Sequence, residues 1–403
     1  MNLFLISQFG QLIHHQALIK RDGLKNNKLV ILYTKANIEV PRKIKKEADN
    51  SLFDEIYLAE LPIKPNSLNL DNINKITTIY SQVLQGISDL YMSSFESHYN
   101  ICHKIAKKEN IKTHLIEEGL ATYKYSYSKF EKVRPSKKNS FIKALNDSGL
   151  SSNKYYPFAK IIYTYLRDFY KLPIQVVKAF RYNKESEYKT YNYLEKLSDE
   201  RRGFIDYAKD FDSINVAYPR AIDGVFSAGQ VNVLNTYATY EPGFDLDGLV
   251  EKYSVSFDDM LYLSQMYPIP SEAYADAVIN VIQEYLSDSS GKCFIKFHPR
   301  DKQDFIDFIK AKVVEMELSE RVLVIEESDF PIEALIKKCQ FDKILGISTT
   351  ALVYANQLSQ STDCVSITNG LIQALGSKCP AKARQVILEH TKMLTIFEHI
   401  DFN

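Results

Sequence analysis

Apolar residues occur along the chain in short runs that alternate with longer amphipathic stretches. In the first third, five runs predict strands, at 2–7, 29–33, 55–59, 90–93 and 112–116. Between them, apolar positions recur with the period of a helix at 11–20, 72–85 and 99–110. Strands that alternate with helices favour a parallel sheet with helices on both faces. Ligands of such sheets bind at the carboxyl ends of the strands.

The same alternation returns in the second half. It predicts strands at 260–264, 292–297, 322–325 and 343–347, and helices at 272–286, 301–313, 332–338 and from 351. The tail at 381–399 has a helical pattern. Before this half, residues 215–218 and 231–236 are strand-like, and 239–248 (TYEPGFDLDG) has the composition of a linker. The pattern therefore predicts an α/β protein of two halves that face a cleft.

The segment from about 124 to 210 interrupts the alternation and is rich in Tyr and Lys. Between 124 and 181 it carries thirteen basic residues and three acidic ones, although the whole chain balances 50 basic against 50 acidic residues. Such a local surplus would steer an anion. The alternatives are a solvated helical face or a surface that contacts anionic membrane lipid.

Composition narrows the class of protein. The chain has 403 residues, 45% hydrophobic and 25% charged, as in folded globular proteins. Its neutral balance argues against a nucleic-acid binder. Its five cysteines form no CxxC pair, which argues against a disulfide framework or a zinc site and favours a reducing compartment. No stretch has the roughly twenty apolar residues of a membrane span, and the first residues read as a strand rather than a signal peptide. We expect a cytoplasmic protein, with peripheral contact to the inner face of the cytoplasmic membrane still open.

A carboxylate pair, Glu117 and Glu118, follows the strand at 112–116 and precedes Gly119. Two adjacent carboxylates repel each other, so the pKa of one should rise. A carboxylate with a raised pKa is suited to act as a general base. The alternative is two solvated acids with Gly119 forming the turn.

Three further groups lie in the second half. Lys296, His298 and Pro299 end a predicted strand just before a helix, whose N-terminus favours anions. A hydroxyl cluster, Ser348–Thr350, stands at a strand-to-helix junction, where it can cap the helix or cradle a phosphate. Glu333 lies near a helix N-terminus, where a carboxylate can accept hydrogen bonds from ribose hydroxyls. For His298, a backbone-bonded structural histidine is the alternative.

Metal binding has weak support in the sequence. Two DxD triplets, 210–212 and 245–247, do not follow a strand of the expected kind. His98 and Cys102 have ligand-like spacing but no further ligands, and we interpret them, with His103, His14 and His15, as structural. We expect no metal site.

The order of these motifs resembles that of bacterial sialyltransferases with a D/E-D/E-G motif, an HP motif and a Ser/Thr pair, and most closely the capsular polysialyltransferase family. The resemblance rests on ISQFGQL (6–12), LIEEGLATYK (115–124), FIKFHPRD (294–301) and GISTTALVYA (346–355). It implies a GT-B fold of two Rossmann-like domains. These would be an acceptor domain, 1–245, with a basic helical insertion at about 124–210, and a CMP-sugar domain, 246–380. A C-terminal helix, 381–403, would cross back onto the first domain.

The resemblance also implies an inverting, metal-independent and cofactor-free transfer of sialic acid from CMP-sialic acid to a sialylated glycan, extending polysialic acid for a capsule. Glu118 would be the base, Glu117 its motif neighbour, and His298 would act on the CMP phosphate. The implied CMP-binding residues are Lys296, Pro299, Glu333, Ser348, Thr349 and Thr350. The implied acceptor-binding residues are Gln8, Gly10, Gln11, Lys124, Lys129, Lys132 and Arg134. Capsule assembly proteins and the inner membrane are implied contacts, and nucleic acid is not.

Three other functions stay open at this point. The enzyme could add a single sialic acid to lipooligosaccharide, or use another cytidine nucleotide to build an envelope polymer. A non-catalytic protein could hold a polyanion on the basic segment. Neither the linkage, the product length nor the oligomeric state follows from the sequence.

Overall fold

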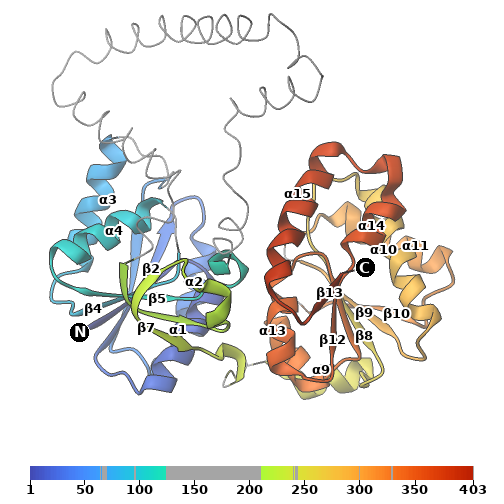
Figure 1. Ribbon diagram of the computed structural model, residues 1–403, viewed down its shortest axis with the longest axis horizontal. Helices are drawn as coiled ribbons and strands as arrows, with labels where there is room; N and C mark the ends of the chain where they lie inside the picture. Colours follow the sequence, from blue (N-terminus) through green and yellow to red (C-terminus); the bar gives the residue numbers. More distant parts are fainter. Residues whose placement is uncertain are drawn as a thin grey trace, which may run out of the picture.

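The computed structural model describes residues 1–63, 65, 70–94, 97–123, 210–238, 240, 244–298, 300–327 and 330–402. These residues form two α/β domains, each built on a parallel sheet (Figure 1). Most of the basic segment, with Lys124, Lys129, Lys132 and Arg134, lies outside the described residues, as does Pro299.

The first sheet has seven parallel strands in the order β3-β2-β1-β4-β5-β6-β7. The strands are β1 (Asn2–Ile6), β2 (Asn27–Thr34), β3 (Glu55–Leu61), β4 (Asp89–Met92), β5 (Lys112–Ile116), β6 (Asp210–Val216) and β7 (Ser227–Val233). The strand order reverses direction between β1 and β4. In a doubly wound sheet the crevice at such a reversal binds the ligand.

Helices cover both faces of this sheet (Figure 1). They are α1 (Phe9–Asp22), α2 (Glu39–Glu47), α3 (Leu70–Val83) and α4 (Ser97–Lys108). Because successive side chains of a strand point to opposite faces, β1 supplies both cores. Phe4 packs with residues of α1 and α2, whereas Leu3 and Leu5 pack with residues of α3 and α4. Helix α2 was not predicted, because Pro41 and Ile44 are its only buried residues among many charges.

The second sheet has six parallel strands in the order β10-β9-β8-β11-β12-β13. The strands are β8 (Met260–Leu263), β9 (Cys293–Lys296), β10 (Val322–Ile325), β11 (Lys343–Gly346), β12 (Asp363–Ser366) and β13 (Ile400–Phe402). The order reverses between β8 and β11, as it does between β1 and β4. The two halves therefore share one topology without an evident sequence repeat.

The helices of the second domain are α9 (Leu246–Tyr253), α10 (Ser271–Ser287), α11 (Gln303–Glu315), α12 (Ile332–Cys339), α13 (Thr350–Leu358), α14 (Thr368–Leu375) and α15 (Ala381–Lys392). Short 3-10 turns lie at η2 (Pro219–Ile222), η3 (Thr236–Ala238), η4 (Gly376–Lys378) and η5 (Met393–Ile396). Helices α10, α11, α14 and α15 contribute to the core on one face of the sheet, and α9, α12 and α13 to the core on the other.

Two expectations change in detail. Helix α9 begins inside the predicted linker, and its N-cap Asp245 accepts a hydrogen bond from the Gly248 N–H at 2.9 Å. Helix α15, expected on the first domain, packs into the core of the second through Ala383 and Ile387. The segment after α15 reaches the first domain, where Phe397 meets the Tyr123 ring at 5.2 Å between centroids. Within the described ranges, no helix is both long and apolar enough to cross a bilayer.

Candidate active site

Glu117, directly after β5, is completely buried. Its carboxyl group accepts hydrogen bonds from the Tyr354 hydroxyl of α13 and, at 2.5 Å, from the Ala217 N–H after β6. Burial raises the pKa of Glu117 to about 7, although hydrogen bonds from Tyr354, Ala217 and Tyr123 act to lower it. Glu117 therefore faces the contact between the domains and not solvent.

Glu118 is partly exposed at the carboxyl edge of the first sheet. The Gln11 side-chain amide donates to its Oε1 at 2.8 Å. The side-chain oxygen of the same Gln11, Oε1, accepts hydrogen bonds from the backbone N–H groups of Ser7 at 2.7 Å and Gln8 at 3.2 Å. Gln11 is itself buried, so its orientation is fixed, and it holds the Glu118 carboxylate against the turn after β1. Gln8 and Gly10 are exposed beside it.

Gly119 brings the carboxylate pair against the hydroxyl cluster of the second domain. Its φ is +102°, and a Cβ at this position would lie 3.0 Å from Cγ2 of Thr350. Both the left-handed backbone and the close contact favour glycine. The turn that carries Glu118 therefore lies against the first turn of α13.

Ser348, Thr349 and Thr350 connect β11 to α13, as predicted. Thr349 is the N-cap, and its hydroxyl accepts from the Ala351 N–H at 3.4 Å. Ser348 is buried and bonded to the Tyr267 hydroxyl at 2.8 Å. Thr349 and Thr350 are half-buried at a helix N-terminus, where backbone N–H groups and the helix dipole favour a phosphate.

His298 follows β9 and is exposed at the carboxyl edge of the second sheet. Its Nδ1 accepts from the Arg300 N–H at 3.1 Å, which leaves the ring proton of the neutral form on Nε2. Partial burial of the ring lowers its pKa, against the opposing charge of Asp301. In its neutral form His298 can therefore donate a hydrogen bond from Nε2.

Lys296 and Glu333 flank this edge. The Lys296 ammonium donates to the Glu327 carbonyl and lies 5.2 Å from the centre of the Phe330 ring. Glu333 stands in the first turn of α12, and burial raises its pKa to about 7. Its charge acts to raise the pKa of Tyr237 and Tyr240, so it lies near the segment that connects the domains.

The sheet register relates the edge positions to one another. Lys296 and Gly346 both pair with Leu263 of β8, which lies between them. With neighbouring strands about 4.8 Å apart, they are separated by about 10 Å. The predicted phosphate-binding groups therefore share one edge of the second sheet.

Several residues of the site carry no signal in the sequence. Tyr218 donates its hydroxyl to the Val353 carbonyl, and the Gln357 amide donates to the Ala217 carbonyl at 3.1 Å. The side-chain oxygen of Gln265, Oε1, accepts a hydrogen bond from the Ser348 N–H at 2.5 Å. A tyrosine or glutamine inside an apolar helix or after a strand looks ordinary, and only the fold places these residues beside the motifs.

The DxD triplets have structural contacts. Asp212 accepts from the Thr113 N–H at 2.8 Å, and Asp245 caps α9. His98 is bonded to the Tyr80 hydroxyl at 2.7 Å. In the part of the chain that the structure describes, no group of three or more His, Cys, Asp or Glu side chains is arranged to hold a metal ion.

The two parallel sheets, with motif residues at the carboxyl ends of their strands, form a fold of the GT-B class. The sequence model of the alpha-2,8-polysialyltransferase family matches residues 2–368, so the chain belongs to this family and is a sialyltransferase. The family implies a nucleotide-sugar donor and a glycan acceptor. A search of curated protein sequences finds no match.

Solved structures share the fold at low sequence identity. Glycyrrhiza uralensis UGT73P12, complexed with glycyrrhetinic acid 3-O-monoglucuronide, gives a TM-score of 0.54 and 9% identity over 100% of this chain and 81% of that one. TcCGT1 in complex with UDP gives 0.52 and 10% identity over 100% and 85%. The GT-B domain of a Photobacterium damselae sialyltransferase gives 0.46 and 12% identity over 100% of both chains.

Proposed function

We propose that this enzyme transfers sialic acid from CMP-sialic acid, with inversion, to the end of a sialylated glycan, and so extends polysialic acid during capsule synthesis. The contact of Gly119 with Thr350 carries the proposal. It sets Glu118, a carboxylate that can take a proton, next to the N-terminus of α13, which can hold a phosphate.

The surroundings of the residues support the following roles. Glu118 takes the proton of the acceptor hydroxyl as general base, and Gln11 holds its carboxylate in place. His298 donates from Nε2 to the departing CMP phosphate, together with the hydroxyls of Thr349 and Thr350. These donors stabilise developing negative charge without a metal ion or cofactor.

The two carboxylates of the pair have different roles. Glu117 is a positioning residue, because its carboxyl group is enclosed and bonded to Tyr354. Ser348 has the same character, since it is buried against Tyr267. Glu333 binds the cytidine ribose, and Lys296 adds positive charge beside the phosphate. Pro299 completes the HP motif outside the described residues.

The acceptor is an anionic, sialylated glycan. Gln8 and Gly10, exposed beside Gln11, contact it near the base, and the basic segment with Lys124, Lys129, Lys132 and Arg134 holds its carboxylates. We place the enzyme in the cytoplasm, in peripheral contact with the inner membrane and capsule assembly proteins. Nucleic acid is not a partner.

The test is an assay with chelator-treated enzyme, CMP-sialic acid and a fluorescent sialylated primer, read by chromatography. We expect a ladder of longer products. Glu118→Gln should abolish transfer while CMP still binds. The matched variant Glu117→Gln keeps an acceptor for Tyr354 and should retain part of the activity. Normal transfer by Glu118→Gln would exclude Glu118 as the base.

The same assay tests the other assignments. His298→Ala should lower transfer sharply, and retention of most activity would remove His298 from the mechanism. A single added sialic acid would indicate a mono-sialyltransferase. Activity only with a cytidine diphosphate donor, or only after metal is restored, would overturn the proposed reaction.

A further inference from the structure

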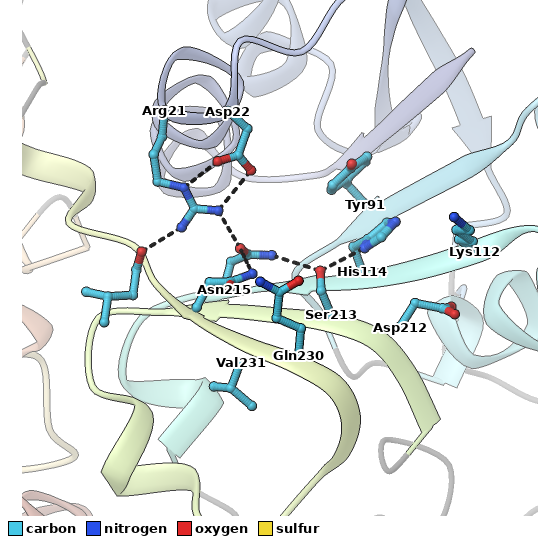
Figure 2. Close-up of a pocket in the computed structure, with 12 residues that line it drawn as sticks. Arg21, Asp22, Tyr91, Lys112, His114, Asp212, Ser213, Asn215, Gln230 and Val231 are labelled. Carbon is cyan, nitrogen blue, oxygen red and sulfur yellow. Dashed lines mark hydrogen bonds and ion pairs between the residues drawn. The ribbon is translucent and has the colours of Figure 1, made fainter.

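A second polar site lies on the first sheet, away from the motifs. A cavity of about 830 Å³ opens over β5, β6 and β7 beside the end of α1 (Figure 2). His114, which lines it, lies on β5 and precedes Glu118, in the turn after the strand, by four residues, which span at most about 13 Å. Of the predicted catalytic and CMP-binding residues that the structure describes, none lines this cavity.

A continuous chain of hydrogen bonds forms the wall of the cavity. The Arg21 guanidinium bonds Asp22 through two nitrogens, at 2.6 and 2.9 Å, and donates to Oδ1 of Asn215 at 2.7 Å. The Asn215 amide donates to the Ser213 hydroxyl at 3.3 Å. These bonds fix planar polar groups from α1 and β6 in one orientation.

The chain continues across β5 to β4. The Ser213 hydroxyl bonds Nδ1 of His114 at 2.8 Å, and Nε2 of His114 bonds Asp89 at 3.0 Å. The Asp89 carboxylate can only accept, so Nε2 of His114 carries a proton, and Nδ1 of the neutral ring accepts from the Ser213 hydroxyl. The His114 ring stacks on Tyr91 with centroids 4.4 Å apart. The wall is therefore rigid before any ligand binds.

The chemistry of the wall restricts its ligand. The described lining carries two cations, Arg21 and Lys112, and two anions, Asp22 and Asp212, so its formal charges balance. Arg21 is held in a two-nitrogen ion pair with Asp22, and Asp212 is paired with Lys107 at 3.3 Å. The described lining offers neither a surplus of positive charge nor a helix N-terminus, the two features that favour a phosphate or a sialic acid carboxylate. The lining is also mostly polar, which does not suit an apolar ligand.

What remains is a surface of fixed donors and acceptors. In Figure 2 the Gln230 amide lies beside Ser213 and Asn215, at the exposed edge formed by β7. Amides, carboxylates and hydroxyls held in place match the hydroxyl groups of a sugar, each of which both donates and accepts. The volume is within the range of ligand sites, about 300–1,000 Å³.

We propose that this cavity binds a neutral, hydroxyl-rich oligosaccharide, at a site separate from the catalytic edge. The inference goes beyond the proposed function, because binding here requires neither the donor nor Glu118. In a glycan-extending enzyme, such a site would hold a neutral part of the acceptor away from its growing end.

The test is saturation-transfer NMR on the full chain with lactose, maltotriose and chitotriose as probes, and sialyllactose for comparison. At least one neutral probe should bind, with a Kd that rises at least tenfold in Gln230→Leu and in Ser213→Ala. Gln230 is exposed, so its variant should fold normally. Glu118→Gln should bind the neutral probe as the wild type does, which separates this site from the base.

Three results would overturn the proposal: no binding of any neutral probe, neutral binding unchanged in both cavity variants, or neutral binding lost in Glu118→Gln. Because the readout is binding without donor, its failure leaves the proposed transfer reaction intact. Loss of transfer in Glu118→Gln likewise says nothing against the cavity.

Discussion

The Tyr354 hydroxyl of the second domain donates a hydrogen bond to the buried carboxyl group of Glu117 in the first. Two more bonds lie along the same helix: Tyr218 donates to the Val353 carbonyl, and Gln357 to the Ala217 carbonyl. Helix α13 thus belongs to the second sheet but is attached to the first domain along its length. Its N-terminus, which we assign to the phosphate, is held at a fixed place relative to Glu118.

We expect Tyr354→Phe to reduce both stability and turnover. The substitution removes a donor to a completely buried carboxyl group, which should lower the free energy of unfolding by about 1–3 kcal/mol. It should also reduce kcat, because the N-terminus of α13 is then no longer held at a fixed position relative to Glu118. Thermal unfolding and steady-state kinetics measure the two effects. Tyr57→Phe is the control, since Tyr57 is 50% exposed. Equal behaviour of the two variants would contradict the role of Tyr354.

Glu117 should make stability depend on pH. Its pKa is raised from 4.5 to about 7, so between these values the folded state keeps a proton that the unfolded state releases. The free energy of unfolding should therefore fall as pH rises from 4.5 to 7, by at most about 1.4 kcal/mol per unit, and then level off.

The variant Glu117→Gln isolates this contribution. Glu333 acts with the same sign, whereas His14, with its pKa lowered to about 4 by burial, acts with the opposite one. The difference between wild type and Glu117→Gln cancels both. Urea unfolding at pH 5, 6 and 7 measures it. Parallel stability curves for the two proteins would show that Glu117 does not titrate in this range.

Gly119→Ala should damage the site more than its backbone strain alone explains. A Cβ at Gly119 meets Thr350 at 3.0 Å, whereas one at Gly23, with φ +61°, meets nothing within 4 Å. Both variants carry the cost of a left-handed backbone, roughly 1–2 kcal/mol. Only Gly119→Ala should also lower transfer activity, and adding Thr350→Ser should restore part of it. Equal activity in the Gly119 and Gly23 variants would argue against a steric conflict between the new Cβ and Thr350.

Gln11→Leu should lower kcat about tenfold with little change in the KM for the donor. The variant releases the Glu118 carboxylate and two N–H groups of the turn before α1. Gln16→Leu is the matched control on the same helix, because Gln16 accepts from the Asp49 N–H at 2.7 Å, a contact with the chain after α2. A normal kcat in Gln11→Leu would mean that Glu118 does not depend on Gln11.

Periodicity predicted most of the described elements because it reports burial within a single segment. Strand β5 begins and ends where expected, and α12 differs by one residue. The pattern fails where burial is small or the element short. Helix α2 buries two residues, and β13 has three residues and, among the described strands, pairs with β12 alone. A segment of three residues is too short to show a hydrophobic period, and it becomes a strand because a neighbouring strand pairs with it.

The sequence by itself determined the alternation of strands and helices. It therefore also determined that the motif residues lie in turns at the carboxyl ends of parallel strands. It also determined the order of those motifs, and with it the family. Only the tertiary structure decided that Glu117 is buried while its neighbour Glu118 is partly exposed. It also brought Gln11 to Glu118, Tyr354 to Glu117 and His114 to Ser213. These pairs are separated by about a hundred residues or more, and pairwise contact over such distances depends on how sheets and helices pack, which no local pattern encodes.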